Sequence, residues 1–128
     1  MLLGGDRPDR GGAFFNATVL TNIPEGSPAY REELFGPVAS VFVVDNATEA
    51  VRLANDSPYG LGGSLWTQDV KKGKQLARQI DSGAVYINQM MASDPAVPFG
   101  GIKRSGYGRE LSHLGIREFM NQKTVWVE

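Results

Sequence analysis

The sequence contains no cysteine among its 128 residues, and this absence removes several kinds of chemistry at once. Without a thiol there is no disulfide, no thiolate metal ligand and no cysteine nucleophile. The only histidine, His113, lies in a predicted helix without acidic or histidine neighbours at metal-ligand spacing. We therefore expect no metal site, and no Ser-His-Asp hydrolase.

An excess of charge of one sign and a long apolar run are also missing. Lys and Arg number 13 against 14 Asp and Glu, a net charge of −1, so the charge favours neither nucleic acid nor an anionic membrane as a partner. The longest nearly unbroken apolar stretch, residues 38–44, is far shorter than the ~20 residues of a membrane-spanning helix, and no signal-peptide pattern opens the sequence. These features predict a soluble, cytoplasmic protein.

Hydrophobic periodicity predicts alternating strands and helices along most of the chain. The predicted strands cover residues 13–23, 38–44, 61–67, 84–88 and 124–127, and the predicted helices cover residues 28–34, 47–55, 70–80 and 110–120, the last with Leu111, Leu114 and Phe119 on its buried side. Short connections between strand, helix and strand predict parallel strands in a layered α/β sheet. Ligands of such sheets bind at the carboxyl ends of the strands.

Two glycine-rich segments are candidate sites. Residues 60–63 precede a predicted strand, which is the wrong context for a phosphate-binding turn, and we expect these glycines to allow close backbone packing. Residues 106–109 precede a helix, close to Lys103 and Arg104, and could hold an anion; a hinge-like loop is the favoured interpretation. The long loop 89–109 is in either case the expected functional region.

Composition and spacing name no reaction, but three segments together carry a family resemblance. They are residues 32–38 (EELFGPV), 55–61 (NDSPYGL) and 98–110 (PFGGIKRSGYGRE). In order and approximate spacing they closely resemble the C-terminal third of aldehyde dehydrogenases, and the likeness runs from about Gly4 to the end. That family oxidises aldehydes with NAD or NADP, using a cysteine thiolate, hydride transfer to the nicotinamide and an activated water.

The resemblance implies roles for particular residues. Glu33 matches the glutamate that hydrogen-bonds the nicotinamide ribose, although from composition alone Glu32 and Glu33 would be a solvated face. Phe35 matches the aromatic residue beside the nicotinamide, and Phe99 matches an aromatic residue at the aldehyde channel. We expect residues 33, 35 and 99 to line one cleft. Residues 1–121 would form the C-terminal part of the catalytic domain, and residues 122–128 the oligomerisation strand, through Thr124, Val125, Trp126 and Val127.

A narrower resemblance concerns the substrate. Residues 93–95 (SDP) and 110–116 (ELSHLGI) are similar to bacterial succinate-semialdehyde dehydrogenases. In that group the serine that matches Ser93 helps bind the distal carboxylate of the substrate, which a hydroxyl donor can do. An ordinary turn residue before Pro95 is the alternative role for Ser93.

No residue of the chain is predicted to be catalytic, because the nucleophile, the general base and the dinucleotide-binding domain of the family would lie outside it. We therefore expect the isolated chain to be inactive. A non-catalytic α/β assembly module is the alternative function. We also expect self-association, because apolar residues such as Val41 and Val43 would lack part of their usual cover.

Overall fold

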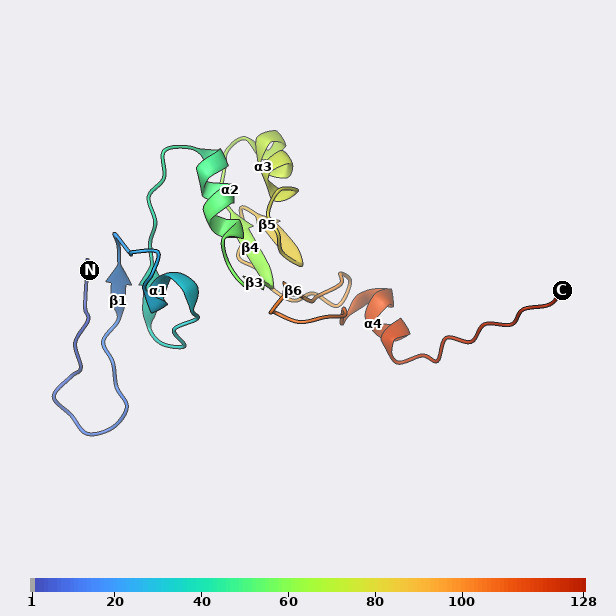
Figure 1. Ribbon diagram of the computed structural model, residues 1–128, viewed down its shortest axis with the longest axis horizontal. Coiled ribbons are helices and arrows are strands. Elements are labelled where there is room, and N and C mark those ends of the chain that lie inside the picture. The colour runs from blue at the N-terminus through green and yellow to red at the C-terminus, as the bar shows by residue number, and fades with distance from the viewer. Residues whose placement is uncertain (1) are drawn as a thin grey trace. The chain divides into compact units, whose positions relative to one another are not determined.

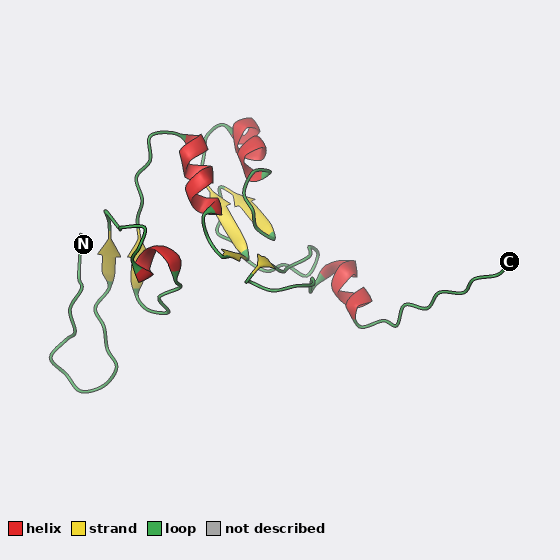
Figure 2. Cartoon of the chain, in the orientation of Figure 1, coloured by secondary structure: helices red, strands yellow, loops and turns green. Residues whose placement is uncertain are grey.

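The computed structural model describes residues 2–128, which form two units that divide between Asn46 and Ala47 (Figures 1 and 2). No composition shift marks this junction. The first unit contains β1 (Thr18–Leu20), α1 (Pro28–Arg31) and β2 (Val38–Ser40). The second unit contains α2 (Ala47–Asn55), β3 (Tyr59–Gly60), β4 (Gly62–Leu65), α3 (Val70–Ala77), β5 (Ala84–Ile87), β6 (Ile102–Lys103) and α4 (Ser112–Glu118).

The first unit is built on one parallel strand pair. β1 pairs with β2 in a register that places Thr18 opposite Val38. Thr18 is 4% exposed, and its hydroxyl accepts a hydrogen bond of 2.9 Å from the backbone N–H of Gly5. The α1 helix starts with Pro28 at its first position, as expected, but it ends at Arg31 because Glu32 is already extended. The predicted helix over residues 28–34 is therefore too long.

The second unit contains a strand–helix–strand arrangement of parallel strands. β4 pairs with β5 in a register that places Gly62 opposite Ala84, and α3 connects them. Asp69 begins α3 by accepting a hydrogen bond of 2.9 Å from the backbone N–H of Lys72, a typical N-cap. In Figure 1, α2 and α3 lie side by side next to this strand pair. The α/β class and the parallel strands predicted from the sequence are confirmed here.

The prediction of one layered sheet is wrong for the described residues, which form separate pairs of strands. β3 and β6 form a third pair, and it is antiparallel, with Gly60 opposite Ile102. Its strands are two residues long. Periodicity cannot report strands this short, because at least four residues are needed to show an alternation. The predicted loop 89–109 thus contains a strand that folds back along β3.

The C-terminal helix also differs from its prediction. α4 begins at Ser112, and Phe119, expected on the buried side, is 94% exposed. The buried position is Gly115, where a Cβ atom would lie 2.8 Å from the carbonyl carbon of Glu110. Residues 121–128 form neither helix nor strand, so the predicted strand 124–127 is not present within this chain.

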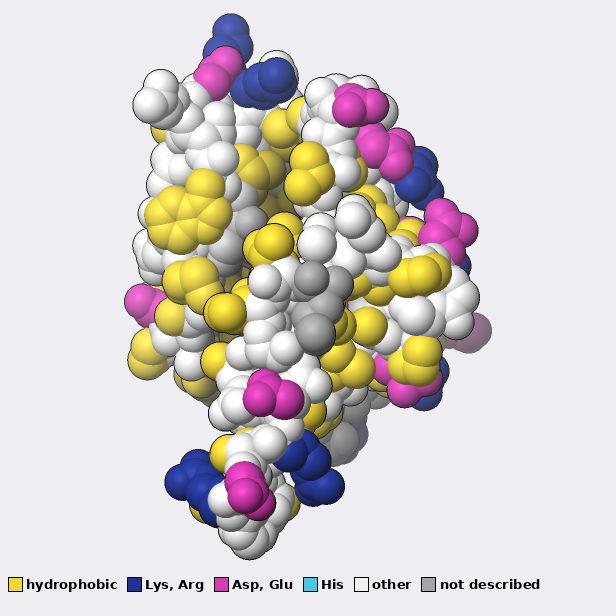
Figure 3. Space-filling model, turned by 90° about the vertical axis from the view of Figure 1, so that its left-hand side faces the viewer, with side chains coloured by type: hydrophobic (Ala, Val, Ile, Leu, Met, Phe, Trp, Pro, Cys, Tyr) yellow, Lys and Arg dark blue, Asp and Glu magenta, His cyan; other side chains and the backbone are white. Residues whose placement is uncertain are grey.

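No apolar side chain among residues 2–128 is buried. The buried positions are Thr18 and glycines, namely Gly60, Gly73, Gly101 and Gly115. Val43 is 90% exposed, Trp66 is 64% exposed and Trp126 is 84% exposed. Figure 3 shows many apolar side chains exposed at the surface. Apolar surface of this extent is typical of a surface that contacts another polypeptide. Within the described part of the chain, no helix has the length and apolar character to cross a membrane.

Candidate functional site

Glu33 and Phe35 lie in the segment between α1 and β2. Phe35 has a φ of 44°, which costs energy for any residue with a Cβ atom, and its ring is 90% exposed. Glu33 is exposed as well, and no other described residue forms a hydrogen bond or ion pair with its carboxylate. A strained backbone that presents an aromatic ring to the outside is found most often where a ligand or partner is bound. The chemistry of these two exposed residues, a carboxylate and an aromatic ring, fits a ribose and a flat heteroaromatic ring.

Phe99 is fixed by its backbone at the start of the glycine-rich loop. Its N–H donates to the carbonyl of Glu110, and the N–H of Glu110 donates back to the carbonyl of Phe99, both at 2.8 Å. The half-buried Phe99 side chain lines a pocket of about 410 Å³. The other lining residues are Leu61, Gly100, Gly101, Ser105, Tyr107, Gly108, Arg109, Glu110, Glu118 and Phe119. An aromatic wall on a pocket of this size suits a small organic substrate.

Several glycines near Phe99 lie so close to other atoms that a Cβ atom would not fit. A Cβ atom at Gly83 would collide with the carbonyl oxygen of Gly100. A Cβ atom at Gly60 would lie 2.8 Å from the carbonyl oxygen of Asp81. At Gly62 it would collide with the sulfur of Met91. The expectation that the glycines of residues 60–63 allow close backbone packing is therefore confirmed for Gly60, whereas Gly62 meets the end of a flexible side chain.

The cations near this loop bind backbone carbonyls. Arg109 Nη1 donates to the carbonyl oxygens of Gly101 at 2.8 Å and Gly108 at 2.7 Å. Lys103 Nζ donates to the carbonyl oxygens of Asn55 and Ser57. These side chains hold the loop in place, and the following helix is too short to form an anion site at its N-terminus. The anion-site hypothesis for residues 106–109 gains no support from this arrangement.

Ser93 lies directly before the turn formed by residues 94–97, in a segment that is anchored on both sides. Before it, the carbonyl of Ala92 accepts a hydrogen bond of 2.6 Å from the Tyr86 hydroxyl. After it, the carboxylate of Asp94 accepts one of 2.8 Å from the N–H of Ala96. Ser93 itself is exposed, and its hydroxyl has no partner among the described residues. The geometry therefore leaves this hydroxyl available to a ligand.

The four candidate residues fall in different units. Glu33 and Phe35 belong to the first, and Ser93 and Phe99 to the second. Because residues 33 and 35 lie in a different unit from residue 99, a cleft shared by the three stays a prediction. Sequence reasoning missed the polar contacts of Asn55 and Lys103. The signal for them was present, since each residue lies within one of the three motifs.

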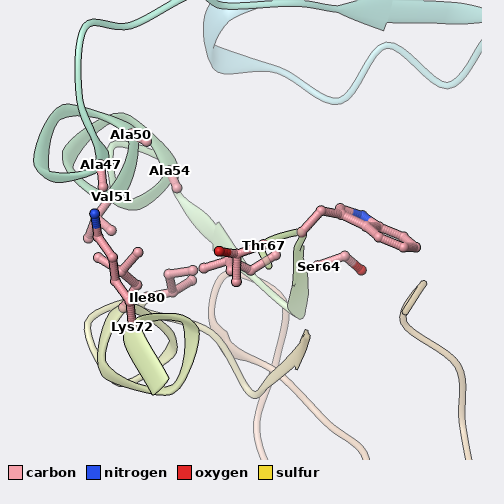
Figure 4. Close-up of a pocket in the computed structure, with 11 residues that line it drawn as sticks. Ala47, Ala50, Val51, Ala54, Ser64, Thr67, Lys72 and Ile80 are labelled. Atoms are coloured by element: carbon pink, nitrogen blue, oxygen red, sulfur yellow. The ribbon is translucent and has the colours of Figure 1, made fainter. Parts of the chain in front are cut away.

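A second pocket, of about 380 Å³, lies between α2, β4 and α3 (Figure 4). Its wall is mostly apolar, and its two hydroxyls are already engaged: Ser64 accepts a hydrogen bond from the N–H of Met91, and Thr67 accepts one from the N–H of Asp69. The lining residues are Ala47, Ala50, Val51, Ala54, Ser64, Leu65, Trp66, Thr67, Lys72, Leu76 and Ile80. None of them is a carboxylate or a histidine, and Lys72 is the ionisable side chain of this lining.

Ionisable groups in the described part of the chain form no cluster that could hold a metal ion. The side-chain hydrogen bonds from Arg52 lower the pKa of Glu49, and the charge of Arg52 adds to this effect. Both residues lie on α2, and the pair belongs to a helix surface and not to either pocket.

Comparison with known proteins places these observations in one family. The pattern of the aldehyde dehydrogenase family matches residues 1–125. A probable NADP⁺-dependent succinate-semialdehyde dehydrogenase of Synechocystis sp. is 55% identical over 124 residues, which are 97% of this chain and 27% of that protein. An NADP⁺-dependent succinate-semialdehyde dehydrogenase of Mycobacterium leprae is 52% identical over 124 residues, again 97% of this chain and 27% of that protein.

Solved structures give the same result. Succinic semialdehyde dehydrogenase from Streptococcus pyogenes, in complex with NADP⁺, has a TM-score of 0.90 and 41% identity over 98% of this chain and 28% of that one. An aldehyde dehydrogenase of Mycobacterium tuberculosis, complexed with NAD⁺, has a TM-score of 0.88 and 42% identity over 99% of this chain and 26% of that one. The chain thus spans about a quarter of the length of the relatives it matches.

Proposed function

The chain belongs to the aldehyde dehydrogenase family, and from this premise we propose that it supplies C-terminal cofactor and substrate contacts to an NAD(P)-dependent succinate-semialdehyde dehydrogenase. When bound, NAD or NADP accepts the hydride of the aldehyde. The chain has no cysteine, so the thiolate nucleophile of the family must come from elsewhere in the enzyme. One observation carries the proposal: the four residues that match family contacts are exposed or line a pocket, whereas the nucleophile is missing.

On the cofactor side, Glu33 accepts hydrogen bonds from the nicotinamide ribose hydroxyls. Hydrogen bonds to an ionised acceptor are roughly twice as strong as neutral ones, and this carboxylate has no described partner with which the ribose would compete. Phe35 then packs its exposed ring beside the nicotinamide. The positive φ of Phe35 is tolerated because it directs the ring outward from the turn before β2.

On the substrate side, Phe99 forms an apolar wall of the aldehyde pocket and excludes water from a hydrolysable intermediate. Ser93 donates its hydroxyl to the distal carboxylate of succinate semialdehyde. The anchored segment around Ser93 supports this role, because backbone that is already ordered loses little entropy on binding.

Residues Thr124, Val125, Trp126 and Val127 are proposed to form a strand on the sheet of a neighbouring subunit. Val125 is 76% exposed and Val127 is 84% exposed. Unpaired backbone and apolar side chains in one short segment are suited to strand addition. A homo-oligomer is the assembly that this pairing would produce.

The test is a chimera in which this chain replaces the matching 27% of the Synechocystis relative. We expect the chimera to reduce NADP⁺ or NAD⁺ when succinate semialdehyde is supplied. The isolated chain should give no reduction above blank with either cofactor. An inactive but folded and tetrameric or dimeric chimera would contradict the proposal and favour a non-catalytic assembly module.

Ser93→Ala in the chimera tests the substrate assignment. A hydrogen bond to a charged group contributes about 1.5–3 kcal/mol, so kcat/KM for succinate semialdehyde should fall about tenfold or more. Butanal has the same chain length without the carboxylate, and its kcat/KM should not change. An equal loss for both aldehydes would show that Ser93 is a turn residue only.

A further inference from the structure

Lys103 is tied to a distant part of the second unit. Its Nζ donates hydrogen bonds to the carbonyl oxygens of Asn55 at 3.0 Å and Ser57 at 3.2 Å. These acceptors precede it by 48 and 46 residues. The carboxylate of Asp81 lies 4.0 Å from the same Nζ, and the Lys103 side chain is 27% exposed. Most of the Lys103 side chain is therefore out of water, and its ammonium group has three acceptor groups nearby.

The two acceptor carbonyls lie at the C-terminal end of α2, which ends at Asn55. The last carbonyls of a helix have no partner within the helix, and the helix dipole makes them a favourable place for a cation. Lys103 therefore caps α2 from a loop that is remote in the sequence. Its backbone has a φ of 54°, an uncommon conformation that persists only where the surroundings fix it.

Asn55 extends the same contact toward α3. Its side-chain Nδ2 donates to the carbonyl of Gln79 at 2.7 Å, and its Oδ1 accepts from the N–H of Asp81 at 2.8 Å. The end of α2, the segment after α3 and β6 are thus joined by two side chains. We call Asn55 and Lys103 the clamp.

Further hydrogen bonds hold the residues that follow Lys103 against the segment before β3 and against β3 itself. The N–H of Arg104 donates to the carbonyl of Pro58 at 2.9 Å. The N–H of Gly60 donates to the hydroxyl of Ser105 at 3.0 Å. On the other side of β6, the backbone of Gly100 packs against Gly83, directly after Phe99. A shift of Lys103 would therefore move the peptide units that carry the Phe99 ring.

We propose that the clamp of Asn55 and Lys103 positions Phe99, and thereby sets the shape of the aldehyde pocket. This inference rests on the proposed function for the identity of the ligand. Neither clamp residue lines that pocket, so both act through Phe99 and not on the substrate. The clamp also joins the motifs at residues 55–61 and 98–110, since the first supplies the acceptors and the second the cation.

The kinetic test is Lys103→Met in the active chimera, with Lys103→Arg as the conservative variant. Methionine keeps an unbranched side chain of nearly the same length and removes the charge and the donors. We expect the aldehyde KM to rise about tenfold, kcat to change less than twofold and the cofactor KM to stay constant. Arginine should restore most of the aldehyde KM, because its guanidinium can donate to the same carbonyls. Lys74→Met, an exposed lysine on α3, is the matched control and should have no effect.

The second test does not depend on activity, so it separates failure of the clamp from failure of the proposed function. Amide hydrogen exchange is measured on the 128-residue chain. Lys103→Met should accelerate exchange of the Gly60 and Arg104 amides about tenfold. The Asn88 amide, which donates to the carbonyl of Leu65 beside the β4–β5 pair, should be unaffected. An unchanged loop, or the same acceleration at all three amides, would overturn the proposal.

Discussion

In the first unit Phe35 projects from a strained turn with its ring 90% exposed, whereas in the second unit Phe99 is half-buried in a loop with many anchors. Phe99 exchanges two backbone hydrogen bonds with Glu110. Behind it, Gly83, Arg109 and Lys103 hold the glycine-rich segment. The first unit therefore exposes an aromatic side chain, whereas in the second unit an aromatic side chain lines a pocket.

This difference suits the two ligand contacts proposed for Phe35 and Phe99. A ring that contacts a flat cofactor needs only to be exposed at the right place, and a positive φ accomplishes that locally. A ring that shapes a pocket must be held on several sides, since a small displacement alters the fit of the substrate. The first unit should thus tolerate backbone changes that the second unit cannot.

Gly83→Ala should produce the largest effect. The added Cβ atom collides with the carbonyl oxygen of Gly100, which is backbone and cannot rotate away. Overpacking of this kind costs up to about 3 kcal/mol, and the urea midpoint followed by Trp66 fluorescence should fall accordingly. Gly36→Ala in the first unit is the control, because its new Cβ would lie 3.7 Å from the carbonyl oxygen of Leu34, an ordinary contact. An equal decrease in the urea midpoint for both variants would show that the two units tolerate backbone changes equally well.

The next effect is kinetic and concerns the two aromatic residues. In the chimera, Phe35→Ala should raise the cofactor KM about tenfold and leave the aldehyde KM unchanged. Phe99→Ala should do the reverse. Tenfold corresponds to about 1.4 kcal/mol, which lies just below the free energy gained by burying a large apolar side chain. If either variant raised both KM values alike, the two units would not divide cofactor from substrate.

A smaller effect should come from the strain at Phe35. A residue with a Cβ atom in the left-handed region costs roughly 1–2 kcal/mol, and glycine avoids this cost. Phe35→Gly should therefore stabilise the β1–β2 pair by about 1 kcal/mol relative to Phe35→Ala, which also lacks the ring. The measurement is exchange of the Val41 amide, which donates to the carbonyl of Leu20 and should be slowed about fivefold. Faster exchange in the glycine variant would show that the turn is unstrained.

The smallest effect is expected at the Glu49–Arg52 pair on α2. Hydrogen bonds from Arg52 lower the pKa of Glu49, so any stabilisation is present above the usual glutamate pKa and is lost as the pH falls through the lowered value. Both side chains are exposed, at 41% and 56%, and water screens the pair. Glu49→Gln should leave the urea midpoint within experimental error at neutral pH and at mildly acidic pH. A clear loss would mean that local ion pairs matter here as much as the long-range contacts of Lys103.

Much of the second unit could be predicted before its structure was known. Residues 47–55 carry a helical repeat, and the predicted bounds of that helix agree with α2. The strand at residues 84–88 agrees with β5 to within one residue. The first unit was harder, because its strands are three residues long and α1 is a single turn. Elements this short are stabilised by hydrogen bonds to neighbouring backbone, and they are too short to show a hydrophobic periodicity.

The sequence by itself determined the family, the α/β class and the absence of a cysteine nucleophile, since motifs and composition are local properties of the chain. Only the tertiary structure decided that β6 runs antiparallel to β3, that Gly83 meets Gly100 and that Lys103 caps a helix 48 residues away. Such contacts depend on where the chain reverses in space. A chain reversal that brings together residues so far apart in the sequence produces no hydrophobic periodicity, so it cannot be predicted from the sequence pattern.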